Sequence, residues 1–175
     1  MIEREYIVAA LIDASGGQLI GRVRLQKALY LLERLDFGTD LPFEYHHYGP
    51  YSRELDNATA DARAFDLVDE EFARRQSDGA MFSIFKLKGA PAIDEALYGE
   101  LGRARTAELM QKFAATNVTV LELAATVDWL WRFEKIADWR SEIAKRKGRK
   151  VQGGRLEKSI ELLGELGLKP PAVPA

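Results

Sequence analysis

Few side chains in this sequence are of the types that usually bind metal ions or carry out catalysis. His46 and His47 are its only histidines, and it has no cysteine. Neighbours on an extended strand point to opposite faces, so the two imidazoles are not expected to share one metal ion. The absence of cysteine excludes a disulfide scaffold and a thiolate zinc site. We therefore predict that both histidines pack and form hydrogen bonds in a loop, and that the protein uses no metal and no cofactor.

Carboxylates are abundant, and general acid–base catalysis would need two of them as a matched pair in a cleft. Most of those in the first half fall on faces expected to be solvated: Asp56, Asp61, Asp66, Asp69, Glu70 and Glu71. Ser15-Gly16-Gly17 lacks the Gly-Lys-Ser/Thr that completes a phosphate loop, so it is predicted to be a turn. Gly153-Gly154-Arg155 could accept an anion at a helix start, but flexibility between two helices explains it as well. The sequence predicts no catalytic residue and no enzyme.

The most uneven charge feature is a basic run near the end of the chain. Residues 135–158 hold nine basic and three acidic residues, a net charge of +6. Five residues of this run could contact phosphates: Lys145, Arg146, Lys147, Arg149 and Lys150. The alternative is a solvated helix end whose basic side chains face its own carbonyl groups. Weak, non-specific nucleic-acid binding is therefore one of two interpretations of this run.

The bulk composition is that of an ordinary globular protein. The chain has 175 residues, of which 47% are hydrophobic and 30% charged, with a net charge of −2. This balance provides no global field to attract nucleic acid or an anionic membrane. The first residues do not resemble a signal peptide, and no apolar stretch reaches the roughly 20 residues of a bilayer span. We expect a cytoplasmic protein with a single domain over residues 1–168 and a flexible tail over 169–175.

The spacing of apolar and turn residues predicts a mainly α fold of the α+β class with one small β-hairpin. Leu25, Ala28, Leu29 and Leu32 recur at the spacing of a buried helix face. Helices are predicted over 3–13, 21–34 and 50–64, with Pro50 as the first residue of the third. Strands are predicted over 67–74 and 81–88 on either side of Ser77-Asp78-Gly79. Three helices followed by a hairpin is the order of a winged helix, which we predict for residues 1–90.

The second half, residues 91–168, is predicted to be helical. A helix should fill most of 93–115, and Thr119 with Glu122 resembles a capping box that begins the next. Further helices are expected over 138–147 and 156–166, with Gly148 and Gly167 ending them. The proline-rich tail cannot continue a helix.

A winged helix often binds DNA, so the charge of its expected recognition helix matters. Residues 50–64 carry two basic and three acidic side chains, and residues 1–90 carry 11 basic and 15 acidic ones, a net charge of −4. Phosphates would repel such a surface. A nucleic-acid-binding transcriptional regulator of the winged-helix type is therefore the second hypothesis.

Two stretches resemble the signatures of a known group of proteins. RLQKALYLLE, from Arg24 to Glu33, resembles the (K/R)LQK-(L/A)-(L/I)-Y-L motif of YwgA-like and Panacea (SocA-like antitoxin) proteins. FEYHHYGPYSREL, from Phe43 to Leu55, resembles the YGPYS-x-x-L signature of the YwgA-like branch, where Panacea proteins have HGPV. Residues 121–126 and 160–168 are also consistent with that branch.

This resemblance implies a bacterial protein with a compact, mainly helical fold and no established enzymatic activity. Panacea relatives act as antitoxins that bind and neutralise toxins, and at least one type delivers its toxin to a protease. The function expected from the resemblance is that of a non-enzymatic regulatory or antitoxin-type protein. It would act in a toxin–antitoxin pair by binding a partner protein, such as a toxin.

The residues of the two motifs are the candidates for partner binding: Gln26, Lys27, Tyr30, His47, Tyr48, Gly49, Pro50, Tyr51 and Ser52. Gly49 permits a sharp turn and Pro50 fixes the entry of the chain that follows. The tyrosine rings either seal the junction between the second and third helices or line a groove for a partner. The sequence leaves both alternatives open.

Overall fold

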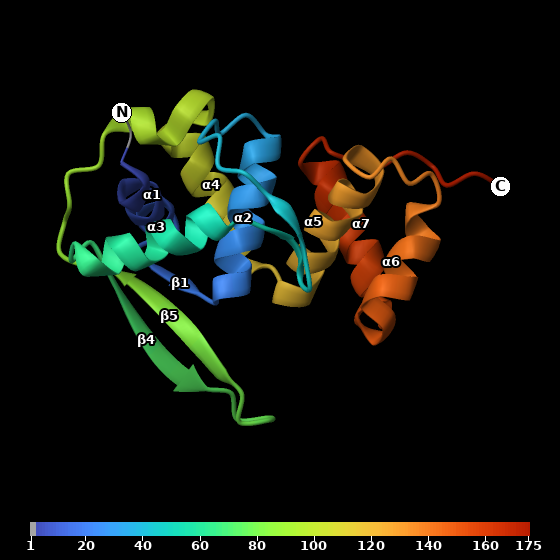
Figure 1. Cartoon of the computed structure of the whole chain (residues 1–175), viewed down its shortest axis with the longest axis horizontal. Helices are drawn as coiled ribbons and strands as arrows, with labels where there is room; N and C mark the ends of the chain where they lie inside the picture. Colours follow the sequence, from blue (N-terminus) through green and yellow to red (C-terminus); the bar gives the residue numbers. More distant parts are fainter. Residues whose placement is uncertain (1–2) are drawn as a thin grey trace.

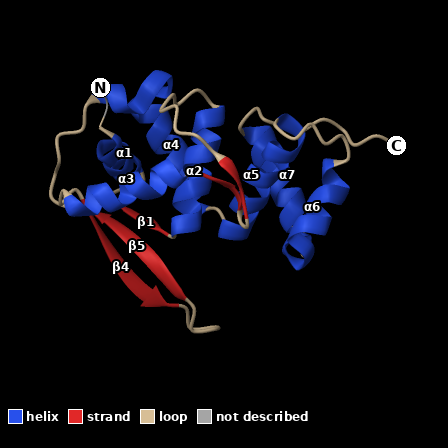
Figure 2. Cartoon of the chain, viewed as in Figure 1, coloured by secondary structure: helices blue, strands red, loops and turns tan. Residues whose placement is uncertain are grey.

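The computed structural model describes residues 3–175 and shows a mainly helical α+β protein. The first half contains α1 (Arg4–Ala14), β1 (Gln18–Ile20), α2 (Arg22–Arg34), β2 (Glu44–His46), β3 (Gly49–Tyr51), α3 (Arg53–Ala64), β4 (Val68–Arg74) and β5 (Met81–Leu87). The second half contains η1 (Glu95–Leu101), α4 (Gly102–Ala115), α5 (Val118–Arg132), α6 (Trp139–Lys147), η2 (Gly148–Val151) and α7 (Arg155–Glu165). All five strands lie in the first half, and the second half consists of helices and loops (Figure 2).

The first half has the order of elements predicted for a winged helix. Strands β1, β5 and β4 form an antiparallel sheet in that order, and β4 and β5 extend from the helical body as the wing (Figure 1). The turn of the wing falls at the predicted Ser77-Asp78-Gly79. Strand β1 was not predicted, because three residues are too few for an alternating pattern to stand out.

A second hairpin, β2–β3, is inserted between α2 and α3, and it corrects the predicted start of the third helix. Pro50 does not open that helix but lies in β3, opposite Tyr45 of β2. Helix α3 begins three residues later, where the Ser52 hydroxyl accepts a hydrogen bond from the Leu55 N–H. Pairing with β2 keeps residues 49–51 extended, which overrides the preference of proline for a first helical turn.

The second half is helical as predicted, with two changes at helix starts. Gly99 and Gly102 have positive φ angles of 55° and 75°, which split the expected 93–115 helix into η1 and α4. Helix α5 is capped by Asn117, whose side chain accepts from the N–H groups of Thr119 and Val120. The predicted capping box of Thr119 with Glu122 does not form, because the Glu122 side chain points instead to two lysines.

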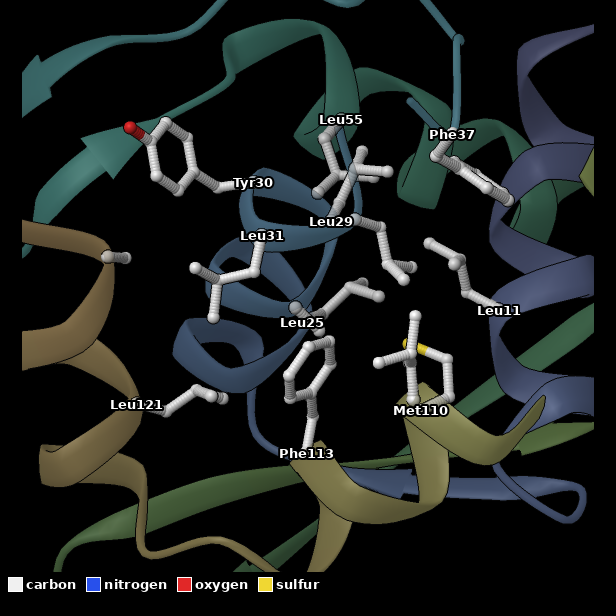
Figure 3. Close-up of a cluster of buried hydrophobic side chains, with 14 of the residues drawn as sticks. Leu11, Leu25, Leu29, Tyr30, Leu31, Phe37, Leu55, Met110, Phe113 and Leu121 are labelled. Atoms are coloured by element: carbon white, nitrogen blue, oxygen red, sulfur yellow. The ribbon is translucent and has the colours of Figure 1, made fainter. Parts of the chain in front are cut away.

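The core lies around α2, which packs against α4 and α5, while α1 packs against α3 and α4. Leu25, Leu29 and Leu31 of α2 are fully buried, together with Phe113 of α4 and Leu121 of α5. Their side chains point into one shared cluster (Figure 3). This core joins the winged-helix half to the helical half.

Residues 169–175 form no helix, as predicted, but they contact the body of the protein. Pro170 is buried, and the Trp139 indole N–H donates to the Pro171 carbonyl at 2.9 Å. Among helices within residues 3–175, none has both the length and the apolar character that crossing a membrane requires.

Candidate partner-binding surface

The Gln26 side chain fixes the chain that leaves the β2–β3 hairpin. Its amide nitrogen donates to the Ser52 carbonyl at 2.8 Å, and its amide oxygen accepts from the Ser52 N–H at 2.8 Å. Both residues are buried. The glutamine thus provides hydrogen-bond partners for both the N–H and the C=O of Ser52, in the way that a residue of a neighbouring strand would.

Lys27 is almost completely buried, with 1% of its surface exposed, and contacts strand β3 of the same hairpin. Its ammonium group donates to the Pro50 carbonyl at 2.6 Å. Burial lowers the pKa of Lys27 to about 7, and the nearby Glu122 carboxylate only partly opposes this effect. Lys27 therefore fixes the hairpin from inside the protein.

Gly49 lies where the hairpin approaches α5 most closely. Its φ angle is +89°, and an added Cβ would come within 2.3 Å of the Thr126 hydroxyl oxygen. A side chain here would need both a left-handed backbone and space that Thr126 occupies. The glycine of the YGPYS motif is thus required by the packing of the hairpin on α5.

Tyr30 connects α2 to the same helix. Its hydroxyl group donates to Asp128 Oδ2 at 2.6 Å, and Arg34 Nε donates to the same oxygen at 2.8 Å. Burial and the Asp128 carboxylate raise the pKa of Tyr30 far above its ordinary value. Asp128 is fully buried, so the arginine and the tyrosine compensate its charge where water does not reach.

Glu122, on α5, connects the hairpin tip to the basic run. Lys147 and Lys150 each donate to Glu122 Oε1 at 2.9 Å, and Glu122 is buried. Lys147 also donates to the His47 carbonyl at 3.2 Å. The tip of the hairpin therefore rests on α6 and η2, 100 residues further along the chain.

Aromatic rings and cations cover the outer side of this junction. The Lys150 ammonium lies 5.0 Å from the centre of the Tyr48 ring, and the Arg146 guanidinium lies 4.7 Å from that of Tyr45. Tyr48 is 50% exposed and Phe133 is 53% exposed. These contacts connect the residues that we name the hairpin surface: Tyr45, His47, Tyr48, Trp129, Phe133, Arg146 and Lys150.

The nine predicted partner-binding residues differ in burial, and the structure divides them into three groups. The buried group lies behind the surface: Gln26, Lys27, Tyr30, Gly49, Pro50 and Ser52. His47 and Tyr48 are exposed at the hairpin tip. Tyr51 is half-buried, stacks on His46 with ring centres 4.5 Å apart, and donates its hydroxyl hydrogen to Asp56. The motif therefore forms a junction, and the residues exposed on it are few.

The basic run is less available to phosphates than its sequence indicates. Lys147 and Lys150 are paired with Glu122, and Arg146 donates to Glu134 and Glu142 at 2.7 Å each. Lys145 and Arg149 are exposed, and no carboxylate of residues 3–175 forms an ion pair with them. Two of the five predicted phosphate contacts are thus exposed cations without an acidic partner.

Of the six carboxylates predicted to lie on solvated faces, four are exposed, whereas Asp56 and Glu70 are partly buried. The Glu70 side chain is completely buried and accepts from Arg22 and Arg63 at 2.8 Å each, so it is not on a solvated face. Burial raises the pKa of Glu70, but the hydrogen bonds from Arg22 and Ser83 and the charges of Arg22 and Arg63 together outweigh this effect and lower the pKa overall. Within residues 3–175, no three metal-binding side chains come together.

Sequence reasoning missed the residues of α5 that complete the junction. Glu122, Thr126 and Asp128 interrupt an otherwise apolar helix. Charged residues on an apolar helix are rarely buried without partners, so they were a usable signal of ionic contacts. Their partners could not be named, because Arg34 lies 94 residues away from Asp128 and Lys147 lies 25 residues from Glu122.

Comparison with known proteins shows distant similarity to two of them. No protein-family model matches the chain. A stretch of 52 residues, 30% of the chain, is 35% identical to the uncharacterized protein YwgA of Bacillus subtilis (strain 168). Over 145 residues, 76% of the chain, it is 30% identical to a DNA ADP-ribosyl glycohydrolase of Thermus aquaticus. The chain spans only 31% of the first relative and 38% of the second. The resemblance to YwgA is thereby confirmed for part of the chain.

Proposed function

We propose that this chain is a regulatory module of the antitoxin type that acts, without catalysis, by binding a partner protein such as a toxin. The observation that carries the proposal is the hairpin surface, on which Tyr48 and Phe133 remain half exposed. Aromatic and arginine side chains are the residues that most often dominate binding energy at protein interfaces. Here they are presented on a hairpin whose position is fixed by buried contacts.

The rigidity of the junction supports this role. Lys27 and Gln26 contact the hairpin from α2, and Lys147 contacts it from α6. A surface that is already ordered loses little conformational entropy when it binds, which increases affinity. The buried residues of the motif would therefore serve binding indirectly, by positioning Tyr48.

The arrangement of buried carboxylates supports a role without catalysis. Glu70, Glu122 and Asp128 are each paired with cations. Such ion pairs are typical of structural anchors, whereas a general acid or base needs a proton that it can exchange with a substrate. The name of the Thermus aquaticus relative gives it a glycohydrolase activity, and this chain corresponds to 38% of its length. We infer that the activity of that relative depends on the part that this chain does not span.

Nucleic-acid binding is the second candidate, favoured by the exposed and unpaired Lys145 and Arg149. Two free cations neutralise few phosphates, so such binding would be weak, sensitive to salt and independent of base sequence.

Two exposed aromatic residues give a direct test of the first proposal. Tagged protein is used to capture partners from its own host, and the captured protein is purified and titrated calorimetrically. Tyr48→Ala and Phe133→Ala should each weaken binding by about 1–3 kcal/mol, because each removes an exposed aromatic anchor from the surface. Both should leave the melting temperature nearly unchanged, since these side chains are half exposed.

The matched control is Ile20→Ala, which removes an exposed apolar side chain from β1. It should bind like the unmodified protein. Equal affinities for the unmodified protein, Tyr48→Ala and Phe133→Ala would overturn the assignment of the hairpin surface. Loss of binding only together with loss of folding would show that the motif is a junction alone.

A further inference from the structure

The outer edge of the wing is a strand with free hydrogen-bonding groups. Strand β4 is at the end of the β1-β5-β4 sheet, and no element of the described residues lies beside its outer edge (Figure 1). The Arg75 N–H donates to the Ala80 carbonyl in this hairpin. Because successive residues of a strand direct their backbone groups to alternate sides, the odd-numbered residues of 69–75 hydrogen-bond with β5. The N–H and C=O groups of Glu70, Phe72 and Arg74 therefore point outward. Unpaired edges of this kind commonly bind another strand.

The charges along β4 would be complementary in an antiparallel pair of two copies, because acidic residues lie at the start of the strand and basic residues at its end. Asp69, Glu70 and Glu71 come first, and Arg74 and Arg75 follow after Phe72 and Ala73. If two copies of β4 pair in antiparallel fashion about Phe72, Asp69 lies opposite Arg75 of the second copy, and Glu70 lies opposite Arg74. In the same register, Phe72 pairs with Phe72 and Glu70 with Arg74. These residues would hydrogen-bond between the two copies through their outward-pointing N–H and C=O groups. Charge order and hydrogen-bond parity thus agree on one register.

We propose that β4 pairs with β4 of a second copy of this chain, forming a symmetric dimer in which the two wings make one continuous sheet. Apolar exposure fits this partner. Phe72 is 56% exposed, and Met81, which lies opposite Arg74 on β5, is 57% exposed. The dimer would cover Phe72, which lies at the centre of the paired strands.

The ion pairs that these charges already form are of two kinds. Glu70 is fully engaged by Arg22 and Arg63, so it contributes little to the dimer. Asp69 lies 3.6 Å from Lys88, and Arg75 lies 3.0 Å from Asp78, with all four side chains largely exposed. Exposed pairs are weak and exchange partners readily. Asp69 and Arg75 can therefore form a new ion pair between the two copies, and substitutions at these two residues should change dimerisation.

The symmetry of the proposed dimer allows a test by charge exchange. Asp69→Arg would place two arginines opposite each other, and Arg75→Asp would place two aspartates opposite each other. Each single variant should weaken dimerisation at least about tenfold in sedimentation velocity over a wide range of protein concentration. The double variant, and an equimolar mixture of the two single variants, should recover it. Contacts within one chain, such as Asp69 with Lys88, are not restored in either case, so recovery reports only on the contact between chains.

Glu161→Arg, an exposed site on α7 with the same change in charge, is the control and should leave the dimer unchanged. Circular dichroism verifies that each variant is folded. The proposal would be overturned by unmodified protein that stays monomeric at its highest soluble concentration. A double variant or a mixture that stays monomeric would overturn it as well.

Discussion

Gly49 offers the sharpest prediction at the scale of single residues. Gly49→Ala should lower the free energy of unfolding by about 2–4 kcal/mol, because a left-handed backbone and a collision with Thr126 both penalise the methyl group. Gly16→Ala is the control: its φ angle is +93°, but nothing lies within 4 Å of the added Cβ. It should cost only the backbone strain, about 1–2 kcal/mol. Urea denaturation of both variants measures the difference, and equal costs would mean that contact with α5 does not dictate this glycine.

Lys27 makes the stability of the protein depend on pH. Its pKa is about 7 in the folded protein and 10.5 as the ordinary value of an unfolded chain. Between these values the unfolded state binds more protons, so the free energy of unfolding should rise with pH, by at most about 1.4 kcal/mol per pH unit. The cost of burying the charged ammonium is complete below about pH 7 and disappears toward the unfolded pKa. Lys27→Met should therefore flatten the rise.

This dependence is measured by urea denaturation between about pH 7 and about pH 9, below the range in which unfolded tyrosines ionise. Lys147, whose pKa is also lowered by burial, stays in the variant, so the slope should decrease without vanishing. Lys145→Met, an exposed lysine of α6, should leave the slope as it is. A slope unaffected by Lys27→Met would assign the pH dependence to other groups.

At the scale of elements, Glu122 determines how the hairpin, α5 and α6 fit together. Glu122→Ala would leave Lys147 buried without a counter-charge, which is expected to cost about 3–5 kcal/mol of stability. Glu142→Ala is the control: it removes one half-buried partner of Arg146, but Arg146 still pairs with Glu134. This variant should lose less than about 1 kcal/mol of stability. Thermal and urea unfolding compare the two. Similar costs would show that the buried ion pair does not hold the elements together.

The elements that local patterns specify were the ones the sequence predicted correctly. Apolar spacing in α2 and the Ser77-Asp78-Gly79 turn depend on nearby residues, and both appear as expected. Pro50 was placed at a helix start because its own preference allows that position, whereas pairing with Tyr45 decides otherwise. Burial of Gln26 and Lys27 could not be predicted either, since it depends on the hairpin that covers them. Tertiary contacts thus decided what local preference left open.

At the scale of the whole molecule, the contacts that complete the first half come from the second. Tyr30 bonds to Asp128 across 98 residues, and His47 is contacted by Lys147 across 100. The winged-helix half therefore shares its core and its ionic contacts with α5 and α6. Residues 1–90 contain the elements of a winged helix but lack the partners that position its inserted hairpin.

These long connections have a consequence for the order of events during synthesis. A ribosome produces the chain from its N-terminus, so α2 and the hairpin emerge well before Glu122 and Lys147 exist. Until then the Glu122 carboxylate, which favours the charge of Lys27, is absent, and Gly49 has no helix to pack on. The hairpin surface can take its final position only when η2 has left the ribosome. A partner that recognises this surface would therefore bind chains that extend beyond η2 and ignore shorter nascent chains.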